Sequence, residues 1–257
     1  MKILVSNDDG IHARGIQALI EALAPQYEVY VVAPDRENSA MGHALTLHSP
    51  LRIQEVTMAA PVKAAYSVSG TPSDCVKIAL NILLEEPMDV VVSGINHGPN
   101  LGADVVYSGT VSAAFEGTIG GLPSVAVSLM NGFEKSADFS HAAQFICQSL
   151  PRMLSLSLPP RTILNVNVPA ESLNHLAGVR VTQLGTRMYK DTYERRTDPR
   201  GQLYYWLVGE EVVAEADAED ADVKAIQNNY ISITPVSFDL TCQPLLGAAR
   251  AVLDQRF

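Results

Sequence analysis

The apolar residues of this chain fall into short runs, each followed by a polar loop and then by apolar positions at helical spacing. The first run is Ile3–Val5, and the helical positions after it are Ile16, Leu19, Ile20 and Leu23. The same succession predicts strands at 27–33, 88–92, 123–129 and 162–168, and helices at 72–84, 111–117 and 141–150. Strands that alternate with helices predict an α/β fold built from βαβ units around a mostly parallel sheet.

Proline and capping residues mark two helix boundaries. Thr71 as N-cap, Pro72 at the first helical position and Asp74 three residues after Thr71 fit a helix start, so we interpret Asp74 as structural. Pro151 is expected to end the preceding helix at residue 150, because proline lacks the N–H that a helix needs.

The pattern changes after Pro169. Strand-like pieces at 179–183 and 203–208 are separated by the mixed-charge stretch 187–200, which predicts a protruding hairpin. The stretch 210–222 holds seven acids and neither Lys nor Arg, so it is expected to be a solvated loop or hairpin face.

Four shorter segments complete the layout. Segments 45–56 and 64–68 predict an antiparallel excursion, 230–236 a returning strand, and 245–253 a short amphipathic terminal helix. We therefore expect one domain over residues 1–257. Its α/β core would span about 1–169, with an arm and a C-terminal return over about 170–257.

Composition excludes several classes of protein. The chain has 257 residues, 47% of them hydrophobic, and it has no apolar run near the roughly 18 residues that cross a bilayer. Its N-terminal apolar stretch is too short for a signal peptide, so we expect a cytoplasmic protein without a membrane partner. A net charge of −10 argues against a nucleic acid polymer as partner. Three cysteines without CxxC spacing, Cys75, Cys147 and Cys242, are expected to be buried thiols.

Two adjacent acids, Asp8 and Asp9, follow the first predicted strand. Ligands of parallel sheets bind at the carboxyl ends of strands, which is where this pair falls. Adjacent carboxylates repel each other, and a cation or a shared proton between them relieves the repulsion. In the alternative interpretation, Asp8 caps the following helix and Asp9 forms a turn with Gly10.

Two further loops are expected at the same edge of the sheet. One holds Ser39, and the other is the long loop 93–104, which contains Asn96. Carboxylate, hydroxyl and amide oxygens suit Mg²⁺, Mn²⁺ or Ca²⁺. The histidines lack zinc spacing, and His43 and His97 are expected at this same edge of the sheet.

A third polar segment, Tyr107–Thr110, comes before a helix of small residues. Hydroxyls and free backbone N–H groups at a helix N-terminus suit a phosphate oxygen. A Ser or Thr N-cap on a tightly packed helix is the other interpretation, and a cap residue can also face a ligand.

Five motifs, in this order along the chain, resemble the stationary-phase survival protein SurE family. They are Ser6–Gly10, Pro34–Arg36 with Ser39, Ser69–Val76, Ser93–Asn96 and Tyr107–Val111. The resemblance implies a Rossmann-like three-layer sandwich and a metal-dependent nucleotidase that releases phosphate from nucleoside 5′- and 3′-monophosphates, in some members also from short polyphosphate. It also implies that Asp8, Asp9, Ser39 and Asn96 hold a divalent ion, Mg²⁺ or Mn²⁺. Arg14 departs from the family, whose members commonly have proline there.

The expected mechanism begins with a metal ion that bridges the Asp8–Asp9 pair and one phosphate oxygen. Ser108, Gly109 and Thr110 would bind the remaining oxygens. An aspartyl-phosphate and a metal-activated water are both open as the nucleophilic route, and we favour water because two acids committed to the metal leave neither free.

Two other classes of protein share parts of this pattern. A phospho-accepting receiver domain also starts with a strand that ends in two acids, but it is about half this length and needs an acceptor Asp where this chain offers Asn96. A non-catalytic, Mg-dependent nucleotide-binding regulator would bind the same substrate without turnover.

The segment from about 185 to 236 is expected to join subunits. Its aromatic residues are Tyr189, Tyr193, Tyr204, Tyr205 and Trp206. Clustered aromatics are typical of contact surfaces, and a two-stranded hairpin is only marginally stable alone. The resemblance also implies a homodimer or homotetramer formed by exchange of C-terminal elements. In the alternative interpretation, Trp206 folds back onto its own core.

Overall fold

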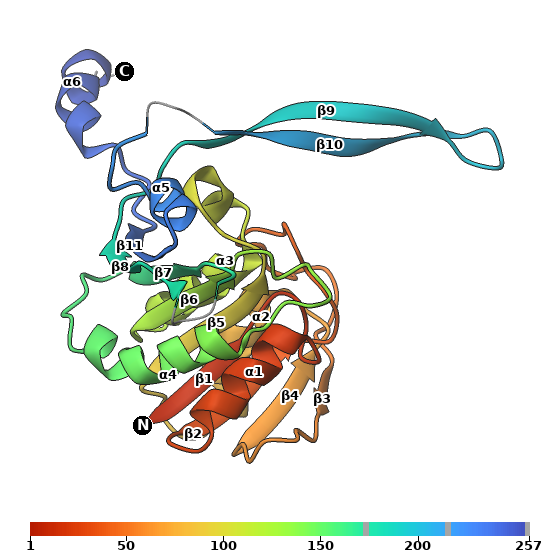
Figure 1. Cartoon of the computed structure of the whole chain (residues 1–257), viewed down its shortest axis with the longest axis vertical. Helices are drawn as coiled ribbons and strands as arrows, with labels where there is room; N and C mark the ends of the chain where they lie inside the picture. The colour runs from red at the N-terminus through yellow and green to blue at the C-terminus, as the bar shows by residue number, and fades with distance from the viewer. Residues whose placement is uncertain (172–174, 214–216, 255–257) are drawn as a thin grey trace.

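The computed structural model describes residues 1–171, 175–213 and 217–254, and within these it leaves the side chains of 188–191 and 210–213 undescribed. The described chain is built on a nine-stranded sheet in the order β3-β4-β2-β1-β5-β6-β7-β11-β8 (Figure 1). The strands are β1 (Lys2–Ser6), β2 (Glu28–Pro34), β3 (Ile53–Glu55), β4 (Ala64–Val68), β5 (Val90–His97), β6 (Ser124–Leu129), β7 (Thr162–Val168), β8 (Gly178–Val181) and β11 (Tyr230–Ser237). The run from β4 to β7 is parallel, so a mostly parallel α/β sheet is confirmed.

Helices cover both faces of the sheet. They are α1 (Arg14–Leu23), α2 (Pro72–Ile78), α3 (Gly109–Ile119), α4 (Ser140–Leu154), α5 (Asp222–Gln227) and α6 (Gln243–Leu253), with a π-helical turn η1 (Ala79–Leu83) and a 3₁₀ turn η2 (Gly102–Val106). Helices α1 and α4 lie together on one face, and α2 and α3 lie on the other. The three-layer arrangement is therefore the expected one.

The apolar run of strand β1 is continuous because the strand is buried on both faces of the sheet. Ile3 and Val5 pack into the core under α1 and α4, whereas Leu4, which points to the opposite face, packs with residues of α2. Strands buried on both faces lose the polar alternation of half-exposed strands. Each such fully buried side chain contributes roughly 1.5–3 kcal/mol to folding.

Helix α4 continues past its proline, so the predicted end at residue 150 is wrong. Pro151 lies inside the helix, which runs to Leu154. Leu150 and Met153 are both buried on the core side, and this burial holds the last turn despite the missing N–H.

The predicted excursion at 45–68 is also partly wrong. Strand β4 is a member of the main sheet and pairs in parallel with β2, and only the short β3 is antiparallel to it. Of the segment 45–56, only 53–55 forms a strand. The preceding residues bond to the start of α2 instead: the Thr46 N–H donates to Asp74 at 3.1 Å, and the Thr71 hydroxyl donates to the Ala44 carbonyl at 2.7 Å.

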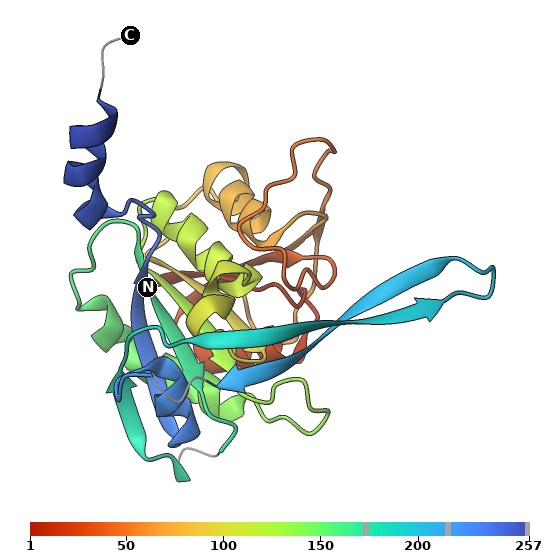
Figure 2. The same cartoon turned by 90° about the horizontal axis from the view of Figure 1, so that it is seen from above.

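The sheet extends beyond Pro169, where the α/β core was expected to end. Strand β11 pairs antiparallel with β7, and β8 pairs in parallel with β11. The mixed-charge stretch 187–200 is not a spacer, because most of it forms β9 (Arg187–Thr197), which pairs with β10 (Leu203–Val213) in a separate two-stranded sheet. This hairpin projects far from the body, as both views show (Figures 1 and 2).

Helix α6 also stands away from the body near the chain end and has no buried residue (Figure 2). Cys242, just before it, is exposed, so the expectation of a buried thiol holds only for Cys75 and Cys147. The acidic stretch 210–222 lies partly outside the described residues, and its last member, Asp222, is fully buried rather than solvated. Among the described residues, no helix is long and apolar enough to span a membrane.

Candidate active site

The predicted acidic pair lies where the sequence pattern placed it, directly after β1. The Asp8 side chain is buried, and that of Asp9 is only 8% exposed. The turn between them and α1 is held by the Asn7 side-chain amide, which donates to the Gly10 carbonyl at 2.9 Å, and by the Asn38 N–H, which donates to the Asp8 carbonyl at 2.7 Å. Helix α1 has Ala13 as its N-cap without a side-chain bond, so Asp8 is not a helix cap.

A cavity of about 270 Å³ joins this pair to the other predicted ligands. The side chains that line it come from the ends of β1 and β5, from the loop after β2, and from the segment before α3. They are Asp8, Asp9, Glu37, Ser39, Asn96, His97, Asn100, Asp104, Tyr107, Ser108 and Phe133, together with Ala40 and Pro99. Asp8, Asp9, Ser39, Asn96 and Ser108 therefore share one cavity although they are up to a hundred residues apart in the chain.

Gly109 and Thr110 lie behind Asp8 rather than on the cavity wall. A Cβ on Gly109 would be 2.7 Å from the Asp8 Cβ, so a side chain has no room where α3 meets the acidic pair. The Thr110 hydroxyl donates a short hydrogen bond to Oδ1 of Asp8. Ser108 is the N-cap of α3, and its hydroxyl oxygen accepts from the Val111 N–H at 3.1 Å.

Both acids hold their protons far more tightly than an ordinary aspartate. Burial, and then the charge of Asp9, raise the pKa of Asp8 to about 7, although hydrogen bonds from Thr110 act in the opposite direction. Burial also raises the pKa of Asp9 to about 7, while the His97 N–H at 3.2 Å works to lower it. A divalent cation between the two carboxylates would relieve both the repulsion and the desolvation.

The other donors near the pair are neutral oxygens. The Ser39 hydroxyl donates to Glu37 at 2.8 Å, which leaves its lone pairs to accept a cation. The Asn96 amide nitrogen donates to the Gly98 carbonyl at 2.8 Å, so the amide oxygen is the end that can bind a metal. In the described residues, no three His, Cys, Asp or Glu side chains are placed to hold a metal ion by themselves. Two carboxylates with neutral oxygens fit a hard cation such as Mg²⁺ or Mn²⁺ better than zinc.

The two histidines that the sequence placed at this edge have different surroundings. The His97 ring has Nδ1 3.7 Å from Asp9 Oδ1, and its Nε2 accepts from the Gly15 N–H at 3.3 Å. Burial, together with the charge of Arg14, lowers the pKa of His97, so the ring is neutral at pH 7. His43 bonds to Glu116 at 2.9 Å and does not line the cavity.

Glu37, Asp104 and Phe133 line the cavity but were not singled out from the sequence, and Tyr107 was named only as the first residue of the polar segment before α3. Glu37 could have been found from its place two residues before Ser39, and Tyr107 and Asp104 from their place between Asn96 and Thr110. Phe133 gave no comparable signal, because it follows β6 in a loop that carries no recognisable motif.

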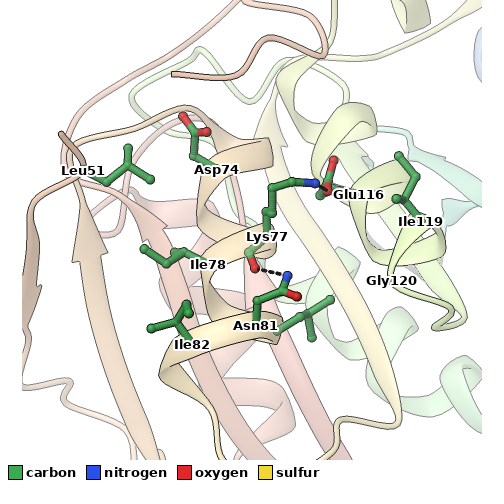
Figure 3. A pocket seen from close by; sticks show the side chains of 10 residues that line it. Leu51, Asp74, Lys77, Ile78, Asn81, Ile82, Glu116, Ile119 and Gly120 are labelled. Atoms are coloured by element: carbon green, nitrogen blue, oxygen red, sulfur yellow. Dashed lines mark hydrogen bonds and ion pairs between the residues drawn. The ribbon is translucent and has the colours of Figure 1, made fainter. Parts of the chain in front are cut away.

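A second cavity, of about 550 Å³, lies elsewhere, between α2 and α3 (Figure 3). Its walls are mostly apolar, and Lys77 and Glu116 point toward each other and form an ion pair. The third charged residue, Asp74, accepts from the Thr46 and Thr71 N–H groups as part of the cap of α2. Both carboxylates are therefore already held by partners. The chemistry therefore belongs to the smaller cavity at the strand ends.

The fold and the site together define a class of protein. A mostly parallel Rossmann-like sheet has two adjacent high-pKa aspartates at the carboxyl end of its first strand, with a capped helix facing them. This is an α/β scaffold whose strand-end site suits a hard cation together with an anionic ligand. The family model described as survival protein SurE matches residues 3–191, and the chain belongs to this family.

Named relatives extend over nearly the whole chain. A protein from Syntrophomonas wolfei called 5′-nucleotidase SurE is 49% identical over 255 residues, which is 99% of this chain and 96% of the relative. A protein of the same name from Gloeobacter violaceus is 52% identical over 249 residues, covering 96% and 94%. The crystal structure of the SurE protein from Aquifex aeolicus has a TM-score of 0.84 and 39% identity, and covers 99% of this chain and 100% of that one.

Proposed function

We propose that this protein is a metal-dependent nucleotidase that hydrolyses the phosphomonoester of nucleoside 5′-monophosphates. The observation that carries the proposal is the buried Asp8–Asp9 pair, with both pKa values raised to about 7, in a cavity that also holds Ser39, Asn96 and Ser108. The name shared by its relatives supports the choice of substrate. Hydrolysis of 3′-monophosphates and of short polyphosphate belongs to the same proposal.

Asp8, Asp9, Ser39 and Asn96 would hold the divalent ion. When bound, a Mg²⁺ or Mn²⁺ ion supplies charge neutralisation to the transferring phosphoryl group and activates a water molecule. With both carboxylates occupied by the cation, neither is available as a nucleophile, and we therefore prefer attack by water over an aspartyl-phosphate.

The N-terminus of α3 would bind the phosphate. The Ser108 oxygen accepts from Val111, which leaves the hydroxyl proton for a phosphate oxygen. Gly109 has no side chain to keep the phosphate away from the backbone N–H groups of the first turn, where anions are favoured.

Two further parts of the proposal concern assembly and turnover. The protein would work as a homodimer or homotetramer, with the β9–β10 hairpin as a contact element. The alternative function is a nucleotide-binding regulator without turnover, which would use the same cavity and the same metal.

Phosphate release from AMP, with and without added Mn²⁺, tests the function. We expect metal-dependent release by the wild type and loss of at least roughly a hundredfold in Asp9→Asn, which keeps the side-chain shape but removes one charge. Asp35→Asn is the matched control, because Asp35 is an exposed acid that follows β2 and lies outside the cavity. Binding of AMP without phosphate release would favour the regulator, and near wild-type turnover in Asp9→Asn would refute the metal site.

A further inference from the structure

Two aromatic side chains border the candidate active site and are largely in solvent. Phe133 is 78% exposed and Tyr107 is 65% exposed, yet both line the cavity that contains Asp8 and Asp9. Single exposed aromatics are common on protein surfaces. Two that line the same cavity from different loops give it apolar surface in addition to the carboxylates of Asp8 and Asp9.

The Phe133 ring is seated on the backbone at the end of β5. A Cβ on Gly98 would be only 2.3 Å from Cε2 of the ring, and Gly98 has a φ of +143°, a conformation that side chains rarely adopt. Gly132, next to Phe133, also approaches this backbone closely, since a Cβ there would be 2.8 Å from the His97 Cα. The ring thus lies against the backbone just after His97, and most of its surface is in solvent.

Arg14 forms hydrogen bonds that hold the backbone of the loop that carries Phe133. Its guanidinium donates to the carbonyls of Lys135 and Glu134, each at 2.8 Å, and to that of Ala137 at 3.3 Å. The same group lies 5.5 Å from the centroid of the Phe139 ring. One side chain at the start of α1 therefore fixes the backbone of this loop on both sides of residue 135.

The backbone of Tyr107 is held by a different part of the chain. Its N–H donates to the Asp104 carbonyl at 3.0 Å, and its carbonyl accepts from the Gly42 N–H at 2.9 Å. It is the residue before Ser108, which caps the proposed phosphate-binding helix. Two aromatic residues, each on a segment whose backbone is held, thus line the cavity where the phosphate would bind.

We propose that Phe133 and Tyr107 hold the nucleobase of the substrate by stacking, and that Arg14 is the positioning residue for Phe133. The inference rests on the proposed function, because it requires a nucleotide whose phosphate lies at Asp8 and Asp9. Every nucleobase has a π face, so stacking recognises a base without distinguishing strongly between bases. The site therefore selects nucleoside monophosphates over sugar phosphates that lack a base.

Kinetics with AMP and with ribose 5-phosphate test the stacking. In Phe133→Ala we expect KM for AMP to rise roughly tenfold with little change in kcat, as for the loss of one base–aromatic contact. The ratio of kcat/KM for AMP to that for ribose 5-phosphate should fall by the same factor. Phe133→Tyr and Tyr107→Phe, which keep a ring, should retain the ratio. An unchanged ratio in both Phe133→Ala and Tyr107→Ala would overturn the inference.

A double-mutant cycle tests the role of Arg14. Arg14→Ala should raise KM for AMP to a similar extent as Phe133→Ala, and the double variant should be no worse than either single one, because both act through the same ring. Additive losses, or a fall in kcat with both substrates, would refute positioning through Phe133.

Equilibrium binding separates this inference from the proposed function. AMP is titrated into wild type and Phe133→Ala by calorimetry in the presence of Mn²⁺. Weaker binding in Phe133→Ala supports the base site, even if the wild type releases no phosphate. Absence of phosphate release would refute only the nucleotidase activity. Equal binding in both proteins, or no binding in either, refutes the base site.

Discussion

The hydroxyl of Thr110 donates a hydrogen bond to Oδ1 of Asp8, which joins the first turn of α3 to the end of β1. The backbone N–H of Thr110 also acts to lower the pKa of Asp8. A threonine hydroxyl has a single proton to donate. The side chain expected to bind phosphate therefore supports the proposed metal-binding carboxylate, and Ser108 and the backbone of the first helical turn are left for the phosphate.

Replacing Thr110 with Val should weaken metal binding more than phosphate binding. The change removes a hydrogen bond to a charged group, worth about 1.5–3 kcal/mol, so we expect the Kd for Mn²⁺ to rise roughly tenfold or more. Thr110→Ser keeps the donor and is the control. Metal titrations and inhibition by free phosphate make the comparison, and a selective loss of phosphate inhibition would return Thr110 to the phosphate site.

The raised pKa values predict that the metal-free protein loses stability as the pH rises. Burial raises the pKa of Asp8 from 3.8 to about 7, so folding favours the protonated form. The stabilisation is complete below the unfolded pKa near 4 and is lost as the pH rises through about 7. The loss for Asp8 alone is on the order of 4 kcal/mol.

Asp8→Asn cannot acquire this charge, so in EDTA at pH 8 its Tm should exceed that of the wild type by several degrees. The difference should vanish near pH 4, and saturating Mn²⁺ should stabilise the wild type much more than the variant. Thermal unfolding at the two pH values makes the measurement, with Asp35→Asn as the control. Equal Tm values at pH 8 without metal would mean that Asp8 does not carry a raised pKa.

Local signals in the sequence were sufficient for most elements. The segments 64–68 and 162–168 are strands with the expected bounds, and Thr71 and Asp74 form the expected capping box on α2. These features depend on neighbours within a few residues. Which strands pair depends on segments far apart in the chain, so the sequence did not predict the parallel pairing of β4 with β2 or the addition of β11 to the sheet.

In the candidate site, too, the residues that could be predicted are those with a local sequence signal. Asp8, Asp9, Ser39 and Asn96 could be nominated because strand ends and oxygen donors are visible in the sequence. The bond between Thr110 and Asp8 spans 102 residues, and the place of Phe133 depends on Arg14 and Gly98 from other parts of the fold. Such contacts are set by tertiary packing, which a linear pattern does not contain.

Glu116 should be important for stability although it lies outside the proposed active site. Its side chain is 5% exposed and bonds to His43 and Lys77. Burial by itself raises the pKa of Glu116, but the hydrogen bonds from these two residues outweigh it and the pKa is lowered. The stabilisation is therefore present at neutral pH and is lost as the pH falls through the lowered pKa.

Glu116→Gln should cost about 2 kcal/mol at pH 7, since Lys77 and His43 are partly exposed and regain some hydration. His43 belongs to the same loop as Ser39, so the Kd for Mn²⁺ should also rise. Denaturant unfolding and metal titration measure the two effects, with Glu85→Gln at an exposed position as the control. If Glu116→Gln is as stable as the wild type, the contacts of Glu116 with His43 and Lys77 do not contribute to the free energy of unfolding.

The β9–β10 hairpin has apolar side chains on both faces. Tyr193, Tyr205 and Leu207 occupy one face, and Trp206 and Val208 the other, as the register of the two strands requires. Trp206 is 57% exposed, so it does not fold back onto the core. Tyr189, another member of the predicted aromatic cluster, has its side chain outside the described residues. A two-stranded hairpin that exposes both faces needs a partner for independent stability.

The base of the hairpin is bound to the candidate active site. Arg187 Nη1 lies 2.7 Å from Asp104 Oδ2, and the buried Asp222 accepts from the N–H groups of Gly102 and Gly185 at 2.9 and 2.8 Å. Removing residues 187–215 would break the ion pair with Asp104, which lines the cavity, as well as any subunit contact. Substitutions nearer the tip separate the two effects because they leave Arg187 in place.

We therefore expect Trp206→Glu combined with Leu207→Glu to lower the mass measured by light scattering at micromolar concentration. The change places charge on both faces of the hairpin, where an interface would have to bury it without a partner, and this costs several kcal/mol. Leu156→Glu, at an exposed apolar position after α4, is the matched control and should leave the mass unaltered. A wild type that already has the monomeric mass of 27.7 kDa and is fully active would refute subunit joining altogether. If the wild type is oligomeric and the doubly charged variant keeps its mass, the subunit contact lies outside the hairpin. Helix α6 is then the element to test next, because its apolar residues Leu245, Val252 and Leu253 are also exposed.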